Sequence, residues 1–95
     1  MPSLETQEYS FIDTDVAKEN IGAVISQYTS LIGDEEDKET PNEELIKKYD
    51  EEISKLATTL RNFHKIPQDE IIQIRKTFGK LYKENQKKMK QGLPI

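Results

Sequence analysis

Residues 41–63 read PNEELIKKYDEEISKLATTLRNF, and the apolar side chains of this stretch return every three or four positions. Such spacing stacks side chains on one face of an α-helix. Thr40 can cap the first backbone N–H groups, Pro41 suits the first helical position, and Glu43 can complete a capping box. The stripe contains Leu45, Tyr49, Ile53, Leu56, Leu60 and Phe63, and is widened by Ile46 and Ala57. The sequence therefore predicts a long amphipathic helix over about 41–63.

A second amphipathic helix is predicted before this stretch, over about 14–32. Its apolar stripe contains Ala17, Ile21, Val24, Ile25, Tyr28, Leu31 and Ile32. Asp13 or Thr14 suits the N-cap, and Gly33 follows where a left-handed residue commonly ends a helix. Residues 34–39 hold charged side chains alone. They lack the spacing of a calcium-binding loop, so we predict a solvated, mobile linker there.

A third helix is predicted to begin at Pro67, because proline breaks the preceding helix near Ile66 and can open the next one. Its stripe contains Ile71, Ile74, Phe78, Leu81, Tyr82 and Met89. Gly92 and Pro94 should end it near residue 90, leaving a loose tail over 91–95. The first dozen residues predict a short helix or a loose segment. Its apolar side chains, expected to dock on the other helices, are Leu4, Tyr9, Phe11 and Ile12.

These elements predict an all-α fold: one domain over 1–95, built as an antiparallel bundle of three long helices plus a short N-terminal helix or segment. No alternating strand pattern bounded by hairpin turns is present, and the chain has no cysteine. Packing must therefore stabilise the fold without disulfides. The residues expected in the core are Leu45, Tyr49, Ile53, Leu60, Ile71, Ile74, Phe78 and Leu81.

The charges are unevenly distributed along the chain. The net charge is −4, but residues 1–44 hold 12 acids against 2 bases and residues 45–95 hold 6 acids against 12 bases. The two parts therefore carry −10 and +6. Such asymmetry can steer a charged partner, and it can equally hold the two parts of one bundle together. No stretch is as apolar as a membrane span, and the first residues do not resemble a signal peptide, so we expect a cytoplasmic protein.

The residues that carry chemistry are sparse. His64 is the only histidine, and no nucleophile or orienting carboxylate is predicted beside it, so it is expected on the surface or at a helix C-terminus. The four glycines are too scattered for a phosphate-binding loop, and a zinc site has almost no ligands. We therefore expect no catalytic site, no cofactor and no metal.

Lysines crowd the last predicted helix. Arg75 and six lysines stand against Glu84 alone, which gives residues 75–90 a charge of +6. Three interpretations remain open: a solvated or internally neutralised face, a contact with a protein or an anionic membrane surface, and nucleic-acid binding. The third is disfavoured by the overall pI of about 5.0 and by the absence of a familiar nucleic-acid motif.

Residues 42–82 carry a family resemblance. Asn42–Ile46, the run Leu60–Pro67 with its Ile66-Pro67 turn, and the helix through Ile74 and Leu81 resemble the third and fourth helices of pediocin-like (class IIa) bacteriocin immunity proteins. The likeness covers about half the chain. The segment before Asp13 and the short C-terminal tail depart from that family, so a three-helix bundle of another lineage also fits.

The resemblance implies an antiparallel four-helix bundle in the cytosol of a Gram-positive bacterium, without enzymatic activity. It implies action at the inner face of the mannose phosphotransferase permease once bacteriocin has engaged it, with specificity largely in the C-terminal half. The candidate partner-binding residues on this chain are Phe63, His64, Lys65, Lys80, Lys83, Lys87, Lys88 and Lys90. The alternative is a plasmid- or phage-encoded antitoxin or inhibitor that covers a basic protein partner with its acidic part.

Overall fold

The computed structural model describes the backbone of residues 4–95 and the side chains of residues 12–95. It is all-helical, with no strand in that part of the chain. The elements are α1 (Leu4–Glu36), α2 (Glu43–Arg61), a single 3₁₀ turn η1 (Phe63–Lys65) and α3 (Gln68–Lys90). The predicted fold class is therefore confirmed for three long helices, whereas a separate short N-terminal helix is absent because α1 is continuous from Leu4.

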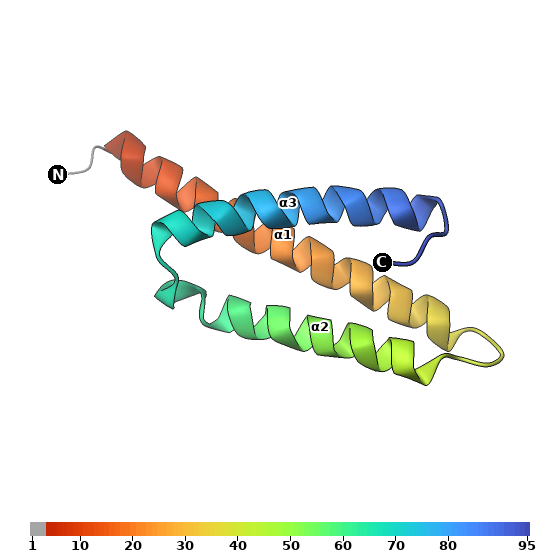
Figure 1. Ribbon diagram of the computed structural model, residues 1–95. Helices are drawn as coiled ribbons and strands as arrows, with labels where there is room; N and C mark the ends of the chain where they lie inside the picture. Colours follow the sequence, from red (N-terminus) through yellow and green to blue (C-terminus); the bar gives the residue numbers. More distant parts are fainter. Residues whose placement is uncertain (1–3) are drawn as a thin grey trace.

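Helix α1 is the centre of the molecule, since it packs against both α2 and α3. Figure 1 shows that α2 runs antiparallel to α1, while α3 runs in the same direction as α1. No Cα atoms of α2 and α3 lie within 8 Å of each other in the described chain. The result is an elongated body of 60 × 26 × 15 Å.

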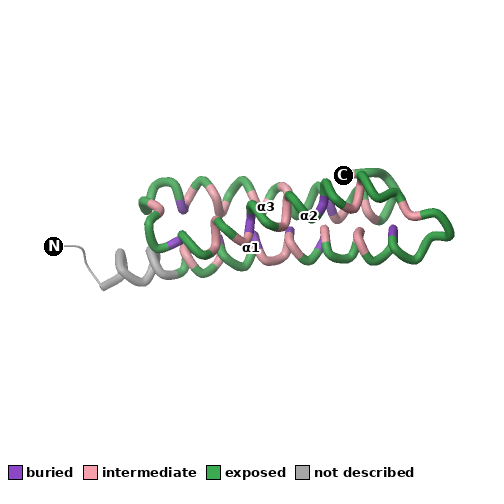
Figure 2. Tube along the Cα trace, turned by 90° about the horizontal axis from the view of Figure 1, so that it is seen from below, coloured by how far each residue is buried: buried purple, intermediate pink, exposed green. Residues whose placement is uncertain are grey.

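The core lies along one face of α1. Ala17, Ile21 and Val24 are fully buried, because α2 and α3 cover this face from two sides. Figure 2 shows buried positions where the helices face each other and exposed positions on their outer surfaces. Leu56, Phe63 and Ile71 complete the buried cluster, and half-buried side chains surround it: Ile25, Tyr28, Leu60, Ile66, Ile74, Phe78 and Leu81.

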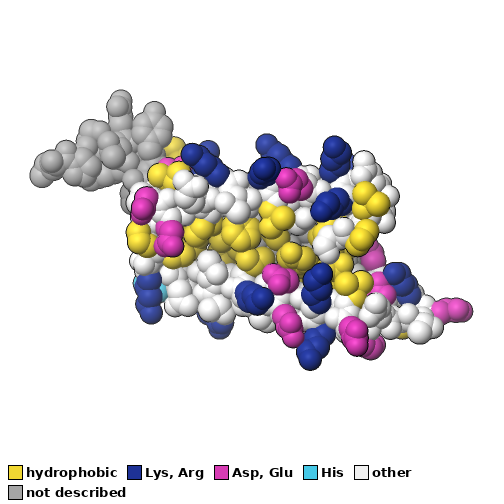
Figure 3. All heavy atoms as spheres, viewed as in Figure 1, with side chains coloured by type: hydrophobic (Ala, Val, Ile, Leu, Met, Phe, Trp, Pro, Cys, Tyr) yellow, Lys and Arg dark blue, Asp and Glu magenta, His cyan; other side chains and the backbone are white. Residues whose placement is uncertain are grey.

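The predicted core residues of α2 and α3 are buried to different extents. Tyr49 and Ile71 are buried, whereas the others stay half-buried: Leu45, Ile53, Leu60, Ile74, Phe78 and Leu81. Their outer parts stay exposed because α2 and α3 do not close against each other. Figure 3 shows the consequence, a band of apolar side chains that runs between α3 and α2.

Aromatic contacts join α1 to α2 and to η1. The rings of Tyr28 and Tyr49 lie 5.6 Å apart between centroids at an interplanar angle of 33°. The Lys18 ammonium lies 5.6 Å above the centre of the Phe63 ring, within cation–π range. Desolvation raises the pKa of both tyrosines above 10.0, and neighbouring carboxylates add to that rise.

The predicted bounds of the first helix were wrong at both ends. Helix α1 begins at Leu4 rather than near 14, and it ends at Glu36 rather than at 32. Gly33 lies inside the helix and has no positive φ. Ile12, predicted to dock on the bundle, is 49% exposed. The side chains of the other residues in that prediction lie outside the described part of the chain: Leu4, Tyr9 and Phe11.

Five of the six side chains of residues 34–39 are exposed, as their composition predicts, but Glu35 is not, and residues 34–36 continue α1 instead of forming a linker. Glu35 is buried and accepts hydrogen bonds from the Lys38 ammonium at 2.7 Å and from the Asn42 backbone N–H at 2.9 Å. These bonds lower the pKa of the Glu35 carboxyl below its ordinary 4.5. The N-cap of α2 is Asn42, whose side chain accepts from the Leu45 N–H, rather than Thr40. Glu35 therefore fastens the loop that joins α1 to α2.

The predicted end of the last helix is confirmed. Gly92 adopts φ +70°, the left-handed conformation that terminates helices, and the Leu93 N–H donates to the Lys88 carbonyl at 2.9 Å. The tail beyond it turns back toward α1 (Figure 1). Leu93 and Pro94 line a hollow with residues of α1 and α2, and both side chains stay exposed.

Candidate functional site

Buried amides fix how α3 lies on α1. The Gln27 side chain donates from Nε2 to the Tyr82 carbonyl at 2.9 Å and to Gln86 Oε1 at 3.2 Å. Its Oε1 accepts from Asn85 Nδ2 at 3.1 Å. Gln27 is 4% exposed and Asn85 is 3% exposed. Because a buried amide without partners is costly, this network favours one register of the two parallel helices.

A second set of polar contacts lies about two turns earlier on both helices. Asn20 Nδ2 donates to the Arg75 carbonyl at 3.0 Å, and the Arg75 guanidinium pairs with the Asp13 carboxylate. Gly79 lies directly beside Asn20: a Cβ placed on Gly79 would be 3.2 Å from Asn20 Nδ2. The missing side chain at Gly79 therefore lets α1 and α3 approach closely and leaves a hollow at the surface.

The groove between α1 and α3 consists of two adjoining hollows that share Tyr82. The first measures about 510 Å³ and is lined by Val16, Asn20, Arg75, Lys76, Gly79, Lys80, Tyr82 and Lys83. The second measures about 440 Å³ and is lined by Ala23, Ser26, Gln27, Ser30, Tyr82, Gln86 and Met89. We call the two together the α1–α3 groove. One half of it is strongly basic, and the other half is neutral.

The basic half holds free positive charge. Lys76, Lys80 and Lys83 are exposed, and none of them forms an ion pair with another residue whose side chain is described. Arg75 differs from them because Asp13 neutralises it. Spacings of four and three place the three lysines on one side of α3. This part of the groove can therefore attract negative charge.

The predicted partner-binding residues do not form one site. Lys80 and Lys83 line the groove, whereas Lys87, Lys88 and Lys90 are exposed near the end of α3 and line neither hollow. His64 and Lys65 are exposed on η1. That turn precedes α3, whose 23 residues span about 35 Å at 1.5 Å per residue. The structure therefore places His64 and Lys65 at the opposite end of α3 from Lys87, Lys88 and Lys90, with Lys80 and Lys83 between them.

The structure corrects the prediction that Phe63 is a partner-binding residue. Its side chain is 3% exposed and belongs to the buried cluster beneath Lys18. An aromatic side chain that packs in the core is not available to contact a partner at the surface. Phe63 lies in η1, just after α2 ends, yet it continues the apolar stripe of α2. It was therefore predicted both as a stripe residue and as a residue of the exposed turn, and the structure supports the first of these.

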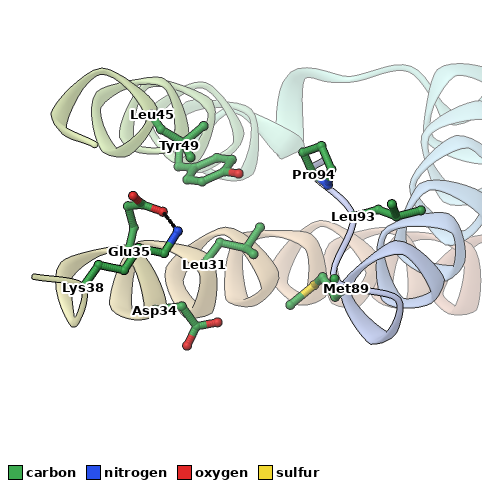
Figure 4. A pocket seen from close by; sticks show the side chains of 10 residues that line it. Leu31, Asp34, Glu35, Lys38, Leu45, Tyr49, Met89, Leu93 and Pro94 are labelled. Carbon is green, nitrogen blue, oxygen red and sulfur yellow. Dashed lines mark hydrogen bonds and ion pairs between the residues drawn. The ribbon is translucent and has the colours of Figure 1, made fainter. Parts of the chain in front are cut away.

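A third hollow, of about 360 Å³, lies where the C-terminal tail approaches α1 and α2. In Figure 4 Pro94 lies over the gap between the two helices, near Tyr49 and opposite Leu31. The dashed line marks the ion pair between Glu35 and Lys38 at one edge. Apolar side chains and a fastened loop therefore surround this hollow, and none of the predicted site residues lines it.

Sequence reasoning missed Arg75 and Lys76 as residues of the groove, and it missed the amides of the α1–α3 contact. Gln27 and Asn20 are seven residues apart, one heptad, so both lie at the same side of the apolar stripe of α1. That spacing was a usable signal. It did not by itself show which helix the amides would meet.

Within the described chain, no three His, Asp or Glu side chains are grouped so that they could hold a metal ion. No helix in that part of the molecule is both long enough and apolar enough to cross a membrane. No protein-family model, no curated protein and no solved structure matches this chain.

Proposed function

We propose that this chain works by stoichiometric binding of a protein partner, without a catalytic step, and that it is a bacteriocin immunity protein of the pediocin-like type. The observation that carries the binding proposal is the set of exposed lysines beside the α1–α3 groove, which form no ion pair among the side chains of residues 12–95. The pattern over residues 42–82 supports the more specific part of the proposal, the family. In this proposal the protein is cytoplasmic and belongs to a Gram-positive bacterium, and its three long helices depart from the four-helix plan that the resemblance implies.

The proposed partner is the mannose phosphotransferase permease after bacteriocin has engaged it. The exposed lysines of α3 would contact the permease or the anionic lipid surface around it, because positive charge is attracted to both acidic protein patches and anionic headgroups. Such contacts speed encounter and fix orientation more than they add affinity. A nucleic-acid partner is not part of the proposal, since the whole chain carries a net charge of −4.

The direct test is protection from killing. The chain would be expressed in a bacteriocin-sensitive strain and challenged with several pediocin-like peptides, and we expect survival against at least one of them. Replacing Lys83, Lys87 and Lys88 together with glutamate should abolish protection while leaving helical circular dichroism unchanged. No protection against any peptide would reject the immunity proposal.

A matched variant separates a local role from a change in net charge. Lys47, Lys48 and Lys55 are exposed on α2, so replacing them with glutamate changes the net charge equally at a different surface. This control variant should protect as well as the unchanged chain. Equal loss in both variants, or unchanged protection by the α3 variant, would reject the role of the α3 lysines.

The alternative is an antitoxin or inhibitor that covers a basic protein, and one observation favours it. Six exposed carboxylates gather where α1 ends and α2 begins: Asp34, Glu36, Asp37, Glu39, Glu43 and Glu44. An acidic surface of this kind can cover a basic nuclease or toxin. The gene neighbourhood distinguishes the two functions, because a small bacteriocin precursor beside this gene supports immunity and a toxin or nuclease gene supports inhibition.

A further inference from the structure

We propose that the α1–α3 groove docks an acidic amphipathic helix of the partner, with the acidic turns of that helix at the Gly79 end. This inference rests on the proposed function as a binding protein and specifies the element that is bound. It is carried by the charge, the length and the exposed apolar side chains of the groove.

The charge at one end selects an acidic occupant. Lys76, Lys80 and Lys83 approach the hollow from α3 and have no ion pair in the part of the chain whose side chains are described. Arg75 contributes little net charge, because Asp13 is paired with it. Three free ammonium groups around one concave surface favour carboxylates that enter it.

Gly79 and Asn20 lie in close contact at this end of the groove. Any larger residue there would project toward Asn20, since even a Cβ would lie 3.2 Å from its amide nitrogen. Asn20 is held in place because its Nδ2 donates to the Arg75 carbonyl. The floor of the hollow is therefore built from a glycine and a tethered amide, and the exposed lysines of α3 border it.

The length of the groove selects an extended occupant over a compact anion. Its α1 side runs from Val16 to Ser30, about 21 Å at 1.5 Å per residue, which is close to four helical turns. Beyond the lysines this side carries the small side chains of Ala23 and Ser26, which allow another helix to approach closely. Nucleic acid fits less well, because a polyphosphate needs cations along its whole length and the second half of the groove has none.

The exposed apolar side chains favour an amphipathic occupant. Tyr82 is 37% exposed at the point where the two hollows meet, and Met89 lines the far end. Ile12 is 49% exposed and lies one turn before Val16 on the same face of α1. A helix with carboxylates on one side and apolar residues on the other would therefore contact the lysines and cover these side chains together.

The test uses a fluorescein-labelled synthetic peptide of about four helical turns, with glutamates at one end of its polar face and leucine and alanine on the other face. Fluorescence polarisation against the purified full chain should show binding that weakens as salt rises from about 25 to 300 mM, because salt screens exposed charges. A peptide with glutamine in place of glutamate should bind on the order of tenfold more weakly.

Two triple variants locate the binding. Replacing Lys76, Lys80 and Lys83 with glutamine should lower peptide affinity on the order of tenfold, whereas replacing Lys47, Lys48 and Lys55 with glutamine should leave it within about twofold. Tyr82→Ala should weaken binding at both salt concentrations, since its contribution is apolar. Absence of peptide binding at low salt, or equal loss in the two triple variants, would overturn the proposal.

Other occupants are outcomes of the same experiment. Tighter binding to phosphatidylglycerol vesicles or to a DNA oligonucleotide than to the peptide, lost in the groove variant, would overturn the helix as occupant. The killing assay is read separately. Lost peptide binding with full protection by the groove variant would overturn the groove and leave immunity standing, whereas peptide binding by a chain that protects no cell would overturn immunity alone.

Discussion

Replacing Gln27 with alanine should destabilise the protein much more than most single substitutions on a helix of this kind. The substitution removes three hydrogen bonds between α1 and α3, each of which contributes about 0.5–1.5 kcal/mol net. It also leaves the Asn85 amide without its partner at a position that is 3% exposed, which costs about 1–3 kcal/mol. The Tyr82 carbonyl loses less, because it lies within a helix.

We therefore expect the free energy of unfolding to fall by about 2–4 kcal/mol, and the melting temperature to fall by at least about 8 °C. Urea and thermal unfolding followed by circular dichroism at 222 nm measure both quantities. Gln73→Ala is the matched control: Gln73 is exposed on α3, and its loss should change the free energy of unfolding by less than about 0.5 kcal/mol.

The double substitution Gln27→Leu with Asn85→Leu tests whether the unpaired Asn85 amide causes most of the loss of stability. If the stranded amide causes most of the loss, removing both polar groups together should restore stability to within about 1 kcal/mol of the unchanged chain. A double variant that loses the sum of the two single losses would refute this account. A loss below about 0.5 kcal/mol in Gln27→Ala would refute it as well.

Three further predictions concern the loop, the helix ends and the corrected site residue. Because its folded-state pKa is lowered, Glu35 stabilises the fold above pH 4.5, and that stability is lost as pH falls through the lowered pKa. Urea titrations at several pH values should show that the free energy of unfolding falls less steeply with decreasing pH in Glu35→Gln than in the unchanged chain. Glu36→Gln, at an exposed position, should match the unchanged chain. Gly92→Ala should lower the melting temperature and reduce the free energy of unfolding by about 1 kcal/mol, because φ at Gly92 is +70°. Gly33→Ala should raise the melting temperature, because Gly33 lies inside α1 and an added Cβ would meet no other atom within 4 Å. The opposite order would contradict the assigned backbone conformations. Phe63→Ala should lower the free energy of unfolding by about 3–5 kcal/mol in chemical denaturation, because the ring is buried. A loss under about 1 kcal/mol would show that Phe63 is a surface residue.

The positions of the helices followed from periodicity, and their ends did not. The stripes of α2 and α3 were long and flanked by helix-breaking residues such as Pro67, so their predicted bounds lie close to those observed. Helix α1 extends past its predicted stripe at both ends, through residues 4–13 and 33–36. A pattern of apolar residues marks the part of a helix that packs, and it carries no information about turns that project past the packed region.

The acidic segment shows a second limit of sequence reasoning. A run of like charges is normally solvated, yet Glu35 is buried because an ammonium and a backbone N–H satisfy its oxygens. Both partners come from the next seven residues, so the arrangement depends on the turn that the loop makes. Composition could not show that turn. The parallel pairing of α1 with α3 was missed for a similar reason, because amphipathic stripes specify which face is buried and leave the neighbour undetermined.

The candidate site was predicted in part. Its exposed lysines could be predicted from the sequence, whereas its shape could not, because the shape depends on how the helices contact each other. Lys80 and Lys83 were found because exposed charge is visible in sequence, whereas the hollow beside them depends on Gly79 meeting Asn20. That meeting is fixed by buried amides, while aromatic contacts hold α1 to α2. The exposed lysines take part in neither contact. Reversing their charge should therefore change what the protein binds without changing how it folds, which is the condition that makes binding and protection assays on these variants interpretable.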